Sequence, residues 1–245
     1  MLKMKIPKTH PRYQSLKTRE QIVVGVKNGI TSIHGLLAHG RGEAFDYLLG
    51  EKTHTFGKKA IEASAALLVS SRYPAISVNG NACALIGKEL VELSGLLNCP
   101  LEINIFHSSK TREKNIRKYL ERYGAKQVFL PQKTCSILHL GSNRKYVNKN
   151  GIYKADTVFV PLEDGDRAKA LIKNGKKVIT IDLNPLSRTS QAATITIVDN
   201  IIRSMPLLIT YIKILKTKDA NFLASIISVY NNKNILRNAE KALRT

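Results

Sequence analysis

The sequence predicts an α/β protein built on a doubly wound, mostly parallel sheet, with a helical amino-terminal segment and a helical carboxyl-terminal tail. Two observations predict this class. Patterns typical of strands and helices alternate along residues 75–130 and again along 157–198, as they do when crossover helices join parallel strands. The expected strands are also apolar without alternation, which indicates burial on both faces of a sheet. We therefore expect one domain over residues 1–245, with the sheet within 75–204.

The first part of the chain, residues 1–74, predicts three helices and no strand. These helices are expected to begin at the N-cap Ser15, at Thr31 or Ser32, and near Lys58. The second helix contains HGRGE, residues 39–43, whose two glycines each cost about 1 kcal/mol relative to alanine. Glycines tolerated at this cost indicate a helix break, a close backbone approach or a bound ligand.

Strands are expected in the middle of the chain at residues 75–78, 101–106, 126–130, 157–160, 177–181 and 194–198. The turn Asn79, Gly80 and Asn81 joins the first strand to a helix over 82–96, and a helix N-terminus in this position suits an anion. A short helix over 168–172 joins the fourth strand to the fifth, and a loop joins the last two strands.

Two segments lie outside this alternation. Residues 131–150 are basic and irregular, and they are longer than a usual connection, so they indicate either a lid over a substrate or a surface excursion. Residues 205–245 predict a helical tail. Its apolar stripe, which is typical of a core or of a subunit interface, consists of Leu208, Tyr211, Ile212 and Leu215.

The chain carries 39 Lys plus Arg against 18 Asp plus Glu, a net charge of +21. Such a surplus suits either nucleic acid, bound through its phosphates, or a basic surface with a site for anionic substrates. The basic residues are spread along the chain, and aromatic residues make up only 6%, without the aromatic motif of RNA-binding sheets. We therefore expect small anionic substrates and consider nucleic acid a poor fit.

The composition also indicates the compartment. No apolar run approaches the roughly 20 residues of a membrane span, and the amino terminus lacks the apolar stretch of a secretory signal. The three cysteines, Cys83, Cys99 and Cys135, form no CxxC pattern, which argues against a disulfide framework and a structural zinc site. A cytoplasmic protein is expected.

Polar side chains follow the expected strands at their carboxyl ends, where ligands bind in open parallel sheets. Asp182 ends one strand and is followed by Asn184, Arg188 and Thr189, and Asn200 ends the next strand. An acidic side chain in such a place accepts hydrogen bonds from ribose hydroxyls. The two strand ends are therefore candidates to hold an adenosine. The alternative for Asp182 is a turn whose polar groups satisfy one another.

A second strand end is crowded with carboxylates. Glu163, Asp164 and Asp166 occupy three of four successive positions. Their mutual repulsion indicates that they are solvated, or that they serve a cation such as Mg²⁺ or a substrate ammonium group. Arg167 then only balances part of their charge.

The sequence has no P-loop, so a phosphate grip would have to depend on arginine. Arg41 lies in the HGRGE segment beside His39 and Glu43. A guanidinium is well suited to phosphate because its planar fork donates two hydrogen bonds.

The sequence resembles the archaeal phosphopantothenate synthetase family through KTHPRYQSLKTREQIVVGV, LAHGRGEAFDYLLGE, SVNGNACAL, GIYKADTVFVPLEDGDR and IDLNPLSRTSQAATITIVDNI. The match is dense and colinear between residues 5 and 206, and it weakens beyond. The resemblance implies a Rossmann-like fold, a homodimer and an ATP-dependent ligase of coenzyme A biosynthesis. Such a ligase would join 4-phosphopantoate to β-alanine through an acyl-adenylate and release AMP and diphosphate.

The resemblance also implies positions for the ligands. The ATP contacts fall on Arg19, Arg41, Asp182, Leu183, Asn184, Arg188, Thr189, Asn200 and Ile201. Arg19 is added by the resemblance alone, since its spacing is that of an ordinary helix arginine. We assign to the phosphopantoate side His39, Asn79, Gly80 and Asn81. Two departures from the family stand out: Ser108 replaces a residue that is often basic, and segment 131–150 retains little beyond Arg144.

The implied reaction requires two anions to meet, because the substrate carboxylate attacks the α-phosphate. Arginine and Mg²⁺ are therefore expected to neutralise charge. The candidate catalytic residues are Arg41, His39 and Asp164, with Asp164 steering the β-alanine ammonium group or holding Mg²⁺. Two competing hypotheses are another nucleotide- or NAD-binding enzyme, for which SVNGNACAL is a poor glycine-rich turn, and a basic RNA-associated module.

Overall fold

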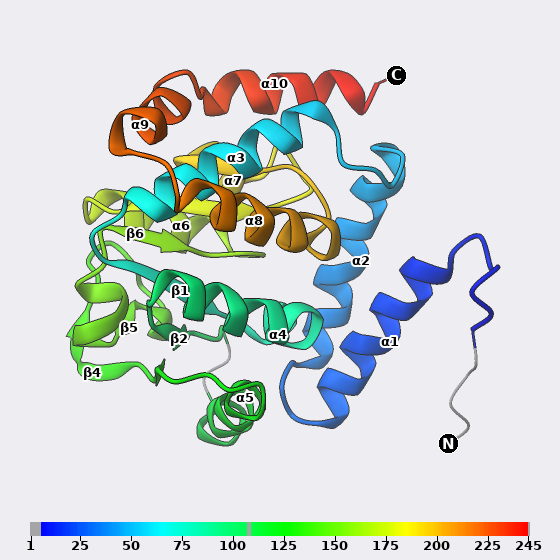
Figure 1. Cartoon of the computed structure of the whole chain (residues 1–245). Coiled ribbons are helices and arrows are strands. Elements are labelled where there is room, and N and C mark those ends of the chain that lie inside the picture. The colour runs from blue at the N-terminus through cyan, green and yellow to red at the C-terminus, as the bar shows by residue number, and fades with distance from the viewer. Residues whose placement is uncertain (1–5, 107–108, 245) are drawn as a thin grey trace.

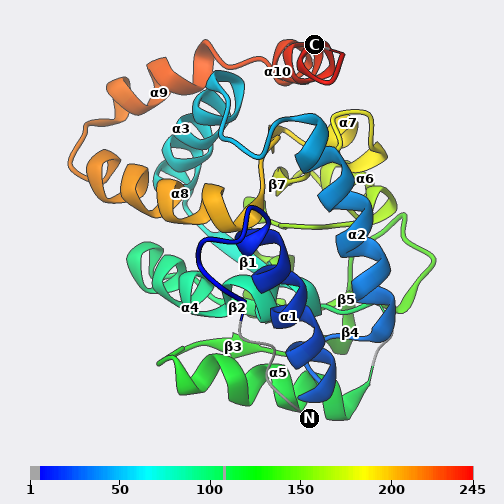
Figure 2. The same cartoon turned by 90° about the vertical axis from the view of Figure 1, so that its right-hand side faces the viewer.

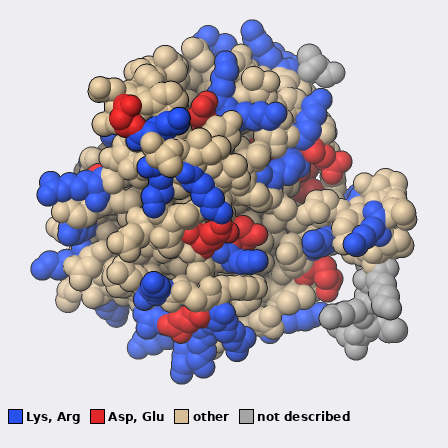
Figure 3. Space-filling model, viewed as in Figure 1, with Lys and Arg blue, Asp and Glu red and all other residues tan. Residues whose placement is uncertain are grey.

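The computed structural model describes residues 6–106 and 109–244, in which helices cover a central sheet (Figure 1). Ser108, one of the two departures from the family, lies outside the described residues. None of the described helices is long and apolar enough to cross a membrane. Lys and Arg side chains are scattered over most of the face that Figure 3 shows, with Asp and Glu among them.

Six parallel strands form the central sheet in the order β3-β2-β1-β6-β7-β8. They are β1 (Pro74–Val78), β2 (Leu101–Ile103), β3 (Val128–Phe129), β6 (Thr157–Phe159), β7 (Lys177–Ile181) and β8 (Ile195–Ile197). Ile76 of β1 pairs with Leu101 on one side and with Phe159 on the other. The strand order therefore reverses between β1 and β6, which is the topological switch point of the sheet. The predicted doubly wound, Rossmann-like sheet is confirmed.

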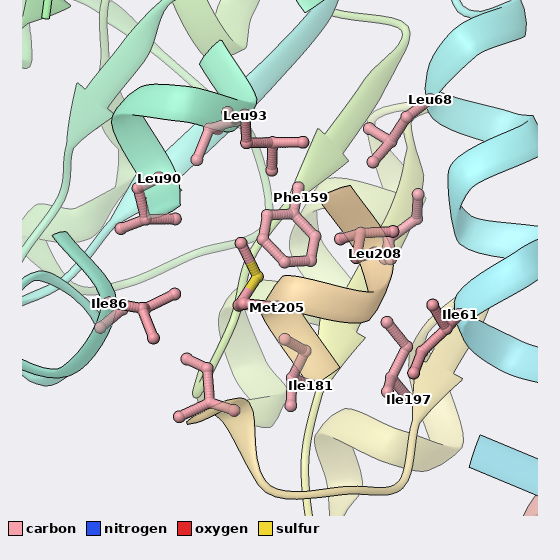
Figure 4. Packing of buried hydrophobic residues seen from close by; sticks show 14 of the residues in the cluster. Ile61, Leu68, Ile86, Leu90, Leu93, Phe159, Ile181, Ile197, Met205 and Leu208 are labelled. Atoms are coloured by element: carbon pink, nitrogen blue, oxygen red, sulfur yellow. The ribbon is translucent and has the colours of Figure 1, made fainter. Parts of the chain in front are cut away.

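Both faces of the sheet are covered because its strands bury apolar side chains on both sides. On one face Phe159 packs against Met205 and Leu208 (Figure 4). Among the helices that supply this larger cluster are α3 (Thr55–Ser70), α4 (Gly80–Leu97), α5 (Lys110–Arg122) and α8 (Ile201–Leu215). On the other face Val158 and Val178 pack against Leu171 of α6 (Gly165–Lys173).

The carboxyl-terminal tail belongs to this core. Leu208, Ile212 and Leu215 are buried in the larger cluster, so their stripe serves the core of the chain. The helix begins at Ile201, four residues before the expected start, because the Asn200 side chain accepts a hydrogen bond from the Ile202 N–H and caps it. Two further helices, α9 (Ala220–Ser228) and α10 (Asn232–Ala242), pack on α3 (Figure 1).

Two segments that were expected to lack regular structure contain it. The loop between the last two strands contains a short helix, α7 (Arg188–Ala192), which the side chain of Ser187 caps. Segment 131–150 contains an antiparallel pair, β4 (Gln132–Ser136) and β5 (Tyr146–Val147). Its buried Ile137 and Val147 cover the second face of the sheet. Here a hairpin takes the place of a crossover helix, which basic and weakly patterned strands do not reveal.

The amino-terminal helices α1 (Tyr13–Lys27) and α2 (Ile33–Leu48) run in opposite directions in front of the strands (Figure 2). The N-cap position of α1 is Arg12, three residues before the expected Ser15, which lies inside the helix and donates to Glu43. Ser32 occupies the N-cap position of α2 as expected. α2 continues unbroken through HGRGE, so of the three explanations for its glycines a helix break is wrong.

Candidate active site at the carboxyl edge of the sheet

α2 crosses the carboxyl ends of the strands and is joined to three of the turns there. Its start is held by Asn81, whose Nδ2 donates to the Gly35 carbonyl at 2.9 Å. Its middle lies over the turn after β7, where a Cβ on Gly42 would be 3.8 Å from Leu183. Its last turn meets the end of β8, where Asn200 Nδ2 donates to Asp46 at 2.7 Å. The helix therefore brings its own side chains to the edge where parallel sheets bind ligands.

The turn after β1 is rigid because each of its three residues is engaged. Asn79 accepts from the Ala82 N–H at 3.0 Å and donates to the Pro161 and Leu162 carbonyls at 2.8 and 3.1 Å. Gly80 is required by space, since a Cβ there would lie 2.8 Å from the Ile30 carbonyl oxygen. The third residue, Asn81, accepts a hydrogen bond from the Thr31 hydroxyl through its side-chain oxygen. What the turn can offer a ligand is therefore chiefly the N-terminus of α4, which suits an anion.

The acidic turn after β6 is neutralised by two arginines. Glu163 is ion-paired with Arg144 of the hairpin and with Arg167 of α6. Burial alone would raise the pKa of Glu163, but the charges of both guanidiniums outweigh it and lower that pKa to about 2. Arg167 is itself fully buried and donates to Ser77 at 2.9 Å. The expectation that Arg167 merely balances charge is wrong, because it holds a buried carboxylate in place.

The other two carboxylates of this turn are also engaged. Asp164 caps α6 by accepting from the Arg167 N–H at 3.0 Å, and its second oxygen is ion-paired with Arg144. Burial, followed by the charge of Glu163, raises the pKa of Asp164. Asp166 is exposed and pairs with Arg188 at 2.9 Å. Within the described residues there is no cluster of three His, Cys, Asp or Glu side chains able to hold a metal ion.

The turn after β7 is built on Asp182. One carboxylate oxygen accepts from the Asn184 N–H at 2.9 Å and the other from the Ser187 hydroxyl at 2.5 Å, so the alternative of a self-satisfied turn describes this residue. Burial raises the pKa of Asp182. Thr189 then ties the turn to its neighbour by donating to the Glu163 carbonyl at 2.8 Å. The β6 and β7 turns therefore form one surface.

An open cavity of about 430 Å³ lies between α1 and α2. It is lined by Arg19, Val23, Leu36, His39, Gly40, Glu43, Ala44 and Tyr47. Arg19 donates from Nε to Glu43 at 2.9 Å, and the hydroxyls of Ser15 and Tyr47 also donate to this carboxylate. Burial would raise the pKa of Glu43, but these hydrogen bonds, that of Arg19 first, lower it to about 2.

His39 also lines this cavity. Its Nε2 is buried and has no hydrogen-bond partner among the described residues, a condition that a ligand or a proton donor would relieve. Burial lowers the pKa of His39. A neutral imidazole can accept a proton.

The structure brings some of the predicted site residues together and separates others. Arg19 and His39 line one cavity, whereas Arg41 is exposed on the other flank of α2, because residues two apart on a helix do not share a face. Leu183 and Ile201 are buried beside the β7 and β8 ends. Those ends carry the remaining candidate ATP contacts: Asp182, Asn184, Arg188, Thr189 and Asn200.

Sequence analysis missed Arg203 and the ion pairs of Arg144 with Glu163 and Asp164. Arg203 is bonded to Asp46 and Asp199, and only its spacing of four residues from Asp199 on a helix could have been noticed. Arg144 is 19 residues from Glu163 in the chain. No local pattern predicts such a contact.

The strand order, the switch point and the polar turns that converge there define an α/β protein of the doubly wound class, in which ligands lie at the carboxyl edge of a parallel sheet. A comparison with protein families narrows this class. The family described as "Phosphopantothenate/pantothenate synthetase" matches residues 56–245. The chain belongs to this family, and the resemblance found in the sequence is confirmed.

Curated relatives agree with this assignment, and each is named 4-phosphopantoate–β-alanine ligase. A relative from Thermococcus onnurineus (strain NA1) is 49% identical over 230 residues, which cover 94% of this chain and 88% of the relative. A relative from Methanosarcina mazei is 46% identical over 234 residues, covering 96% of this chain and 92% of the relative. In each of these two comparisons the similarity covers nearly the whole of this chain and of the relative.

Proposed function

We propose that the protein is an ATP-dependent ligase that joins 4-phosphopantoate to β-alanine, giving 4′-phosphopantothenate, AMP and diphosphate. The observation that carries this proposal is the 46–49% identity with ligases of this name over most of the chain. The carboxyl edge of the sheet supports it, since rigid turns and guanidiniums meet there. The function belongs to coenzyme A biosynthesis.

The nucleotide is proposed to lie across the β7 and β8 ends. Asp182, Leu183 and Asn184 would border the adenosine on one side, and Asn200 and Ile201 on the other. Arg188 and Thr189 begin α7, whose N-terminus favours negative charge. Arg41 on α2 is proposed to hold the phosphates, since a guanidinium binds phosphate through two parallel hydrogen bonds. Arg19 lies on the opposite flank of α2 and is ion-paired with Glu43, so this arrangement does not fit the expectation that both guanidiniums grip one triphosphate.

The acyl substrate is proposed to lie on the β1 side of the switch point. Asn79, Gly80 and Asn81 keep the α4 N-terminus in a fixed position for the phosphate of 4-phosphopantoate. His39 lies between this turn and the nucleotide edge along α2, so it is proposed to face the reacting groups. An anchored phosphate would hold the substrate carboxylate near the α-phosphate of ATP.

The residues of the edge do not fit a dedicated Mg²⁺ site. Glu163, Asp164 and Asp182 each accept hydrogen bonds from a guanidinium, a hydroxyl or a backbone N–H. We therefore propose that Mg²⁺ enters with the phosphates of ATP, as it commonly does, and that charge on the protein side is neutralised by arginine. Asp164 is instead proposed to attract the ammonium group of β-alanine, because its side chain is 35% exposed, whereas that of Glu163 is 2% exposed.

Two steps account for the reaction. In the first, a carboxylate oxygen of 4-phosphopantoate attacks the α-phosphorus, and the bond to the β-phosphate breaks and releases diphosphate. In the second, the β-alanine nitrogen attacks the acyl carbon, the bond to AMP breaks, and the nitrogen loses a proton. His39 is proposed to accept that proton because burial favours its neutral form. Arg41 is proposed to stabilise charge on the α-phosphate.

One assay tests the proposed function. The protein is mixed with ATP, Mg²⁺, 4-phosphopantoate and β-alanine, and the nucleotide products are separated. AMP that requires both substrates supports the proposal, whereas ADP would retain the ligase but replace the acyl-adenylate by an acyl-phosphate. If neither AMP nor ADP forms, and the protein binds polyanions with an affinity that falls steeply with salt, the RNA-associated module is favoured instead.

The protein is further proposed to act as a homodimer in the cytoplasm. The outward face of α2 exposes Ile33, Leu37 and Leu48 at 60–71%, and an exposed apolar stripe of this kind marks a contact surface. The spacing of these residues, with Gly40 and Ala44 between them, places them on one face of the helix. The cysteines Cys83, Cys99 and Cys135 are free, as expected in a reducing compartment.

A further inference from the structure

The last turn of α2 is fastened to the end of β8 by an arginine that the proposed reaction does not use. Arg203, in the first turn of α8, donates from Nη2 to Oδ1 of Asp46 at 2.5 Å and from Nη1 to Oδ2 at 3.1 Å. The same guanidinium donates from Nε and Nη2 to Oδ1 of Asp199 at 3.0 and 2.7 Å. One side chain therefore joins α2, β8 and α8.

Charge makes this arginine necessary. The side chains of Asp46 and Asp199 are 6% and 0% exposed, and two buried carboxylates this close would repel each other without a cation between them. Burial alone would lower the pKa of Arg203, but the hydrogen bond with Asp46 and the charge of Asp199 outweigh it and raise that pKa. The guanidinium is thus a permanent cation whose planar fork holds both carboxylates.

Asp46 also shares its carboxylate with the nucleotide edge. Its Oδ2 accepts from Asn200 Nδ2 at 2.7 Å, and Asn200 is a proposed ATP contact. If ATP engages the Asn200 amide, Asp46 still keeps both of its bonds to Arg203. Thr53 adds a further tie beyond α2, since its hydroxyl donates to Oδ2 of Asp199 at 2.7 Å. The attachment of α2 to β8 can therefore persist while ATP is bound.

The helix that is held in this way carries two proposed catalytic side chains. Arg41 lies five residues before Asp46, roughly 7.5 Å along the helix axis, and His39 lies two residues further. The other end of α2 is held through Gly35 and Asn81. Loss of the attachment at Asp46 would let the helix tilt about this first anchor and shift Arg41 and His39 relative to the strand ends. Displacements of about 1 Å can slow a reaction about a hundredfold.

We propose that Arg203 and Asp46 are positioning residues, whose ion pair holds α2, and with it Arg41 and His39, at the working distance from the nucleotide edge. This proposal rests on the proposed function, because it takes the β7 and β8 ends as the place of ATP. It also explains why two acidic side chains are buried beside a half-buried arginine at a strand end.

The test uses the full chain and the variants Arg203→Lys, Asp46→Asn and the double variant that combines them. Lysine keeps the charge but cannot hold two carboxylates with one planar fork. We expect each single variant to bind ATP about tenfold more weakly in calorimetry and to form AMP more slowly. The double variant should be no weaker than either single one, because both changes break the same contact.

A matched control is Lys213→Ala, which removes an exposed ion pair between α8 and Glu92 of α4. ATP binding by this variant should equal that of the wild type. A merely structural role would lower the melting temperature of Arg203→Lys and Asp46→Asn while leaving ATP affinity unchanged, and this result would overturn the proposal. Additive losses in the double variant would overturn it as well. A wild type that binds ATP but forms neither AMP nor ADP refutes the ligase, and the positioning role is then judged by ATP affinity alone.

Discussion

At the scale of single residues, the site is dominated by buried carboxylates that specific hydrogen-bond donors surround. Glu43 illustrates this, since Arg19, Ser15 and Tyr47 all donate to it. The sequence places Glu43 in a cluster with His39 and Arg41. It does not show that Glu43 turns toward α1 and fixes the orientation of Arg19, because that contact depends on how two helices pack.

Glu43 should make stability depend on pH in a defined window. Its pKa in the folded protein is about 2, below its ordinary value of 4.5, so the ionised form stabilises the fold above about pH 5 and the contribution is lost as the pH falls toward 2. Glu43→Gln should therefore lower the melting temperature at pH 7 and narrow its difference from the wild type in acid. Circular dichroism melts between about pH 7 and pH 2 measure this. A constant difference across the window would contradict the assignment.

Two glycines should respond to alanine in opposite directions. Gly80→Ala places a Cβ 2.8 Å from the Ile30 carbonyl oxygen and 2.9 Å from Thr31 Cα, so we expect a loss of roughly 1–3 kcal/mol. Gly40→Ala meets no atom of the described residues within 4 Å and should gain about 0.5–1 kcal/mol from helix propensity. Urea unfolding measures both changes in stability.

Because Gly40 lines the α1–α2 cavity, the Gly40→Ala variant should also bind substrate more weakly. Unchanged substrate binding would leave the glycine at this position unexplained.

At the scale of elements, the hairpin of β4 and β5 has a role that neither of the alternatives from sequence captured. It replaces a crossover helix on the second face of the sheet, and it delivers Arg144 to the β6 turn. Arg144 Nε donates a hydrogen bond to Oδ1 of Asn104, at the end of β2, at 2.8 Å. The arginine therefore connects the ends of β2 and β6. The length of segment 131–150 is therefore explained by the hairpin and by the position of Arg144.

Removing this arginine should be far more costly than removing an exposed one. Arg144→Met leaves Glu163 with one cation and Asp164 without its partner, and breaking a buried pair on one side costs about 3–5 kcal/mol. The comparison variant is Arg188→Ala, because its pair with Asp166 is exposed on both sides and should contribute less than about 1 kcal/mol. Denaturant unfolding of both variants gives the two values. Similar losses in the two variants would show that the buried cluster is not what stabilises this turn.

At the scale of the whole molecule, the exposed apolar face of α2 should decide the oligomeric state. Leu37, at 71% exposure, lies near the middle of that face. Leu37→Glu should convert a dimer into a monomer without a loss of melting temperature in dilute solution, since the side chain contributes little to the core of its own chain. Light scattering coupled to size exclusion measures the mass. A wild type that is monomeric at assay concentrations would refute the proposed homodimer.

The sequence by itself determined the class of fold, the six strands and the edge at which polar residues gather, because burial on both faces leaves an apolar pattern that is local in the chain. The resemblance to the synthetase family was equally legible, since it depends on contiguous segments. Element ends were less secure: capping by Asn200 moved one helix start, capping by Ser187 began a helix where a loop was expected, and the hairpin had too few apolar residues to be recognised.

Only the tertiary structure decided which charges meet. Arg144 with Glu163, Arg203 with Asp46, and Arg19 with Glu43 are joined across 19, 157 and 24 residues. It also decided that the acidic turn is neutralised by arginines and that Arg41 and Arg19 lie on opposite flanks of α2. Electrostatic energy depends on distance and burial in three dimensions, and a chain read in order contains neither.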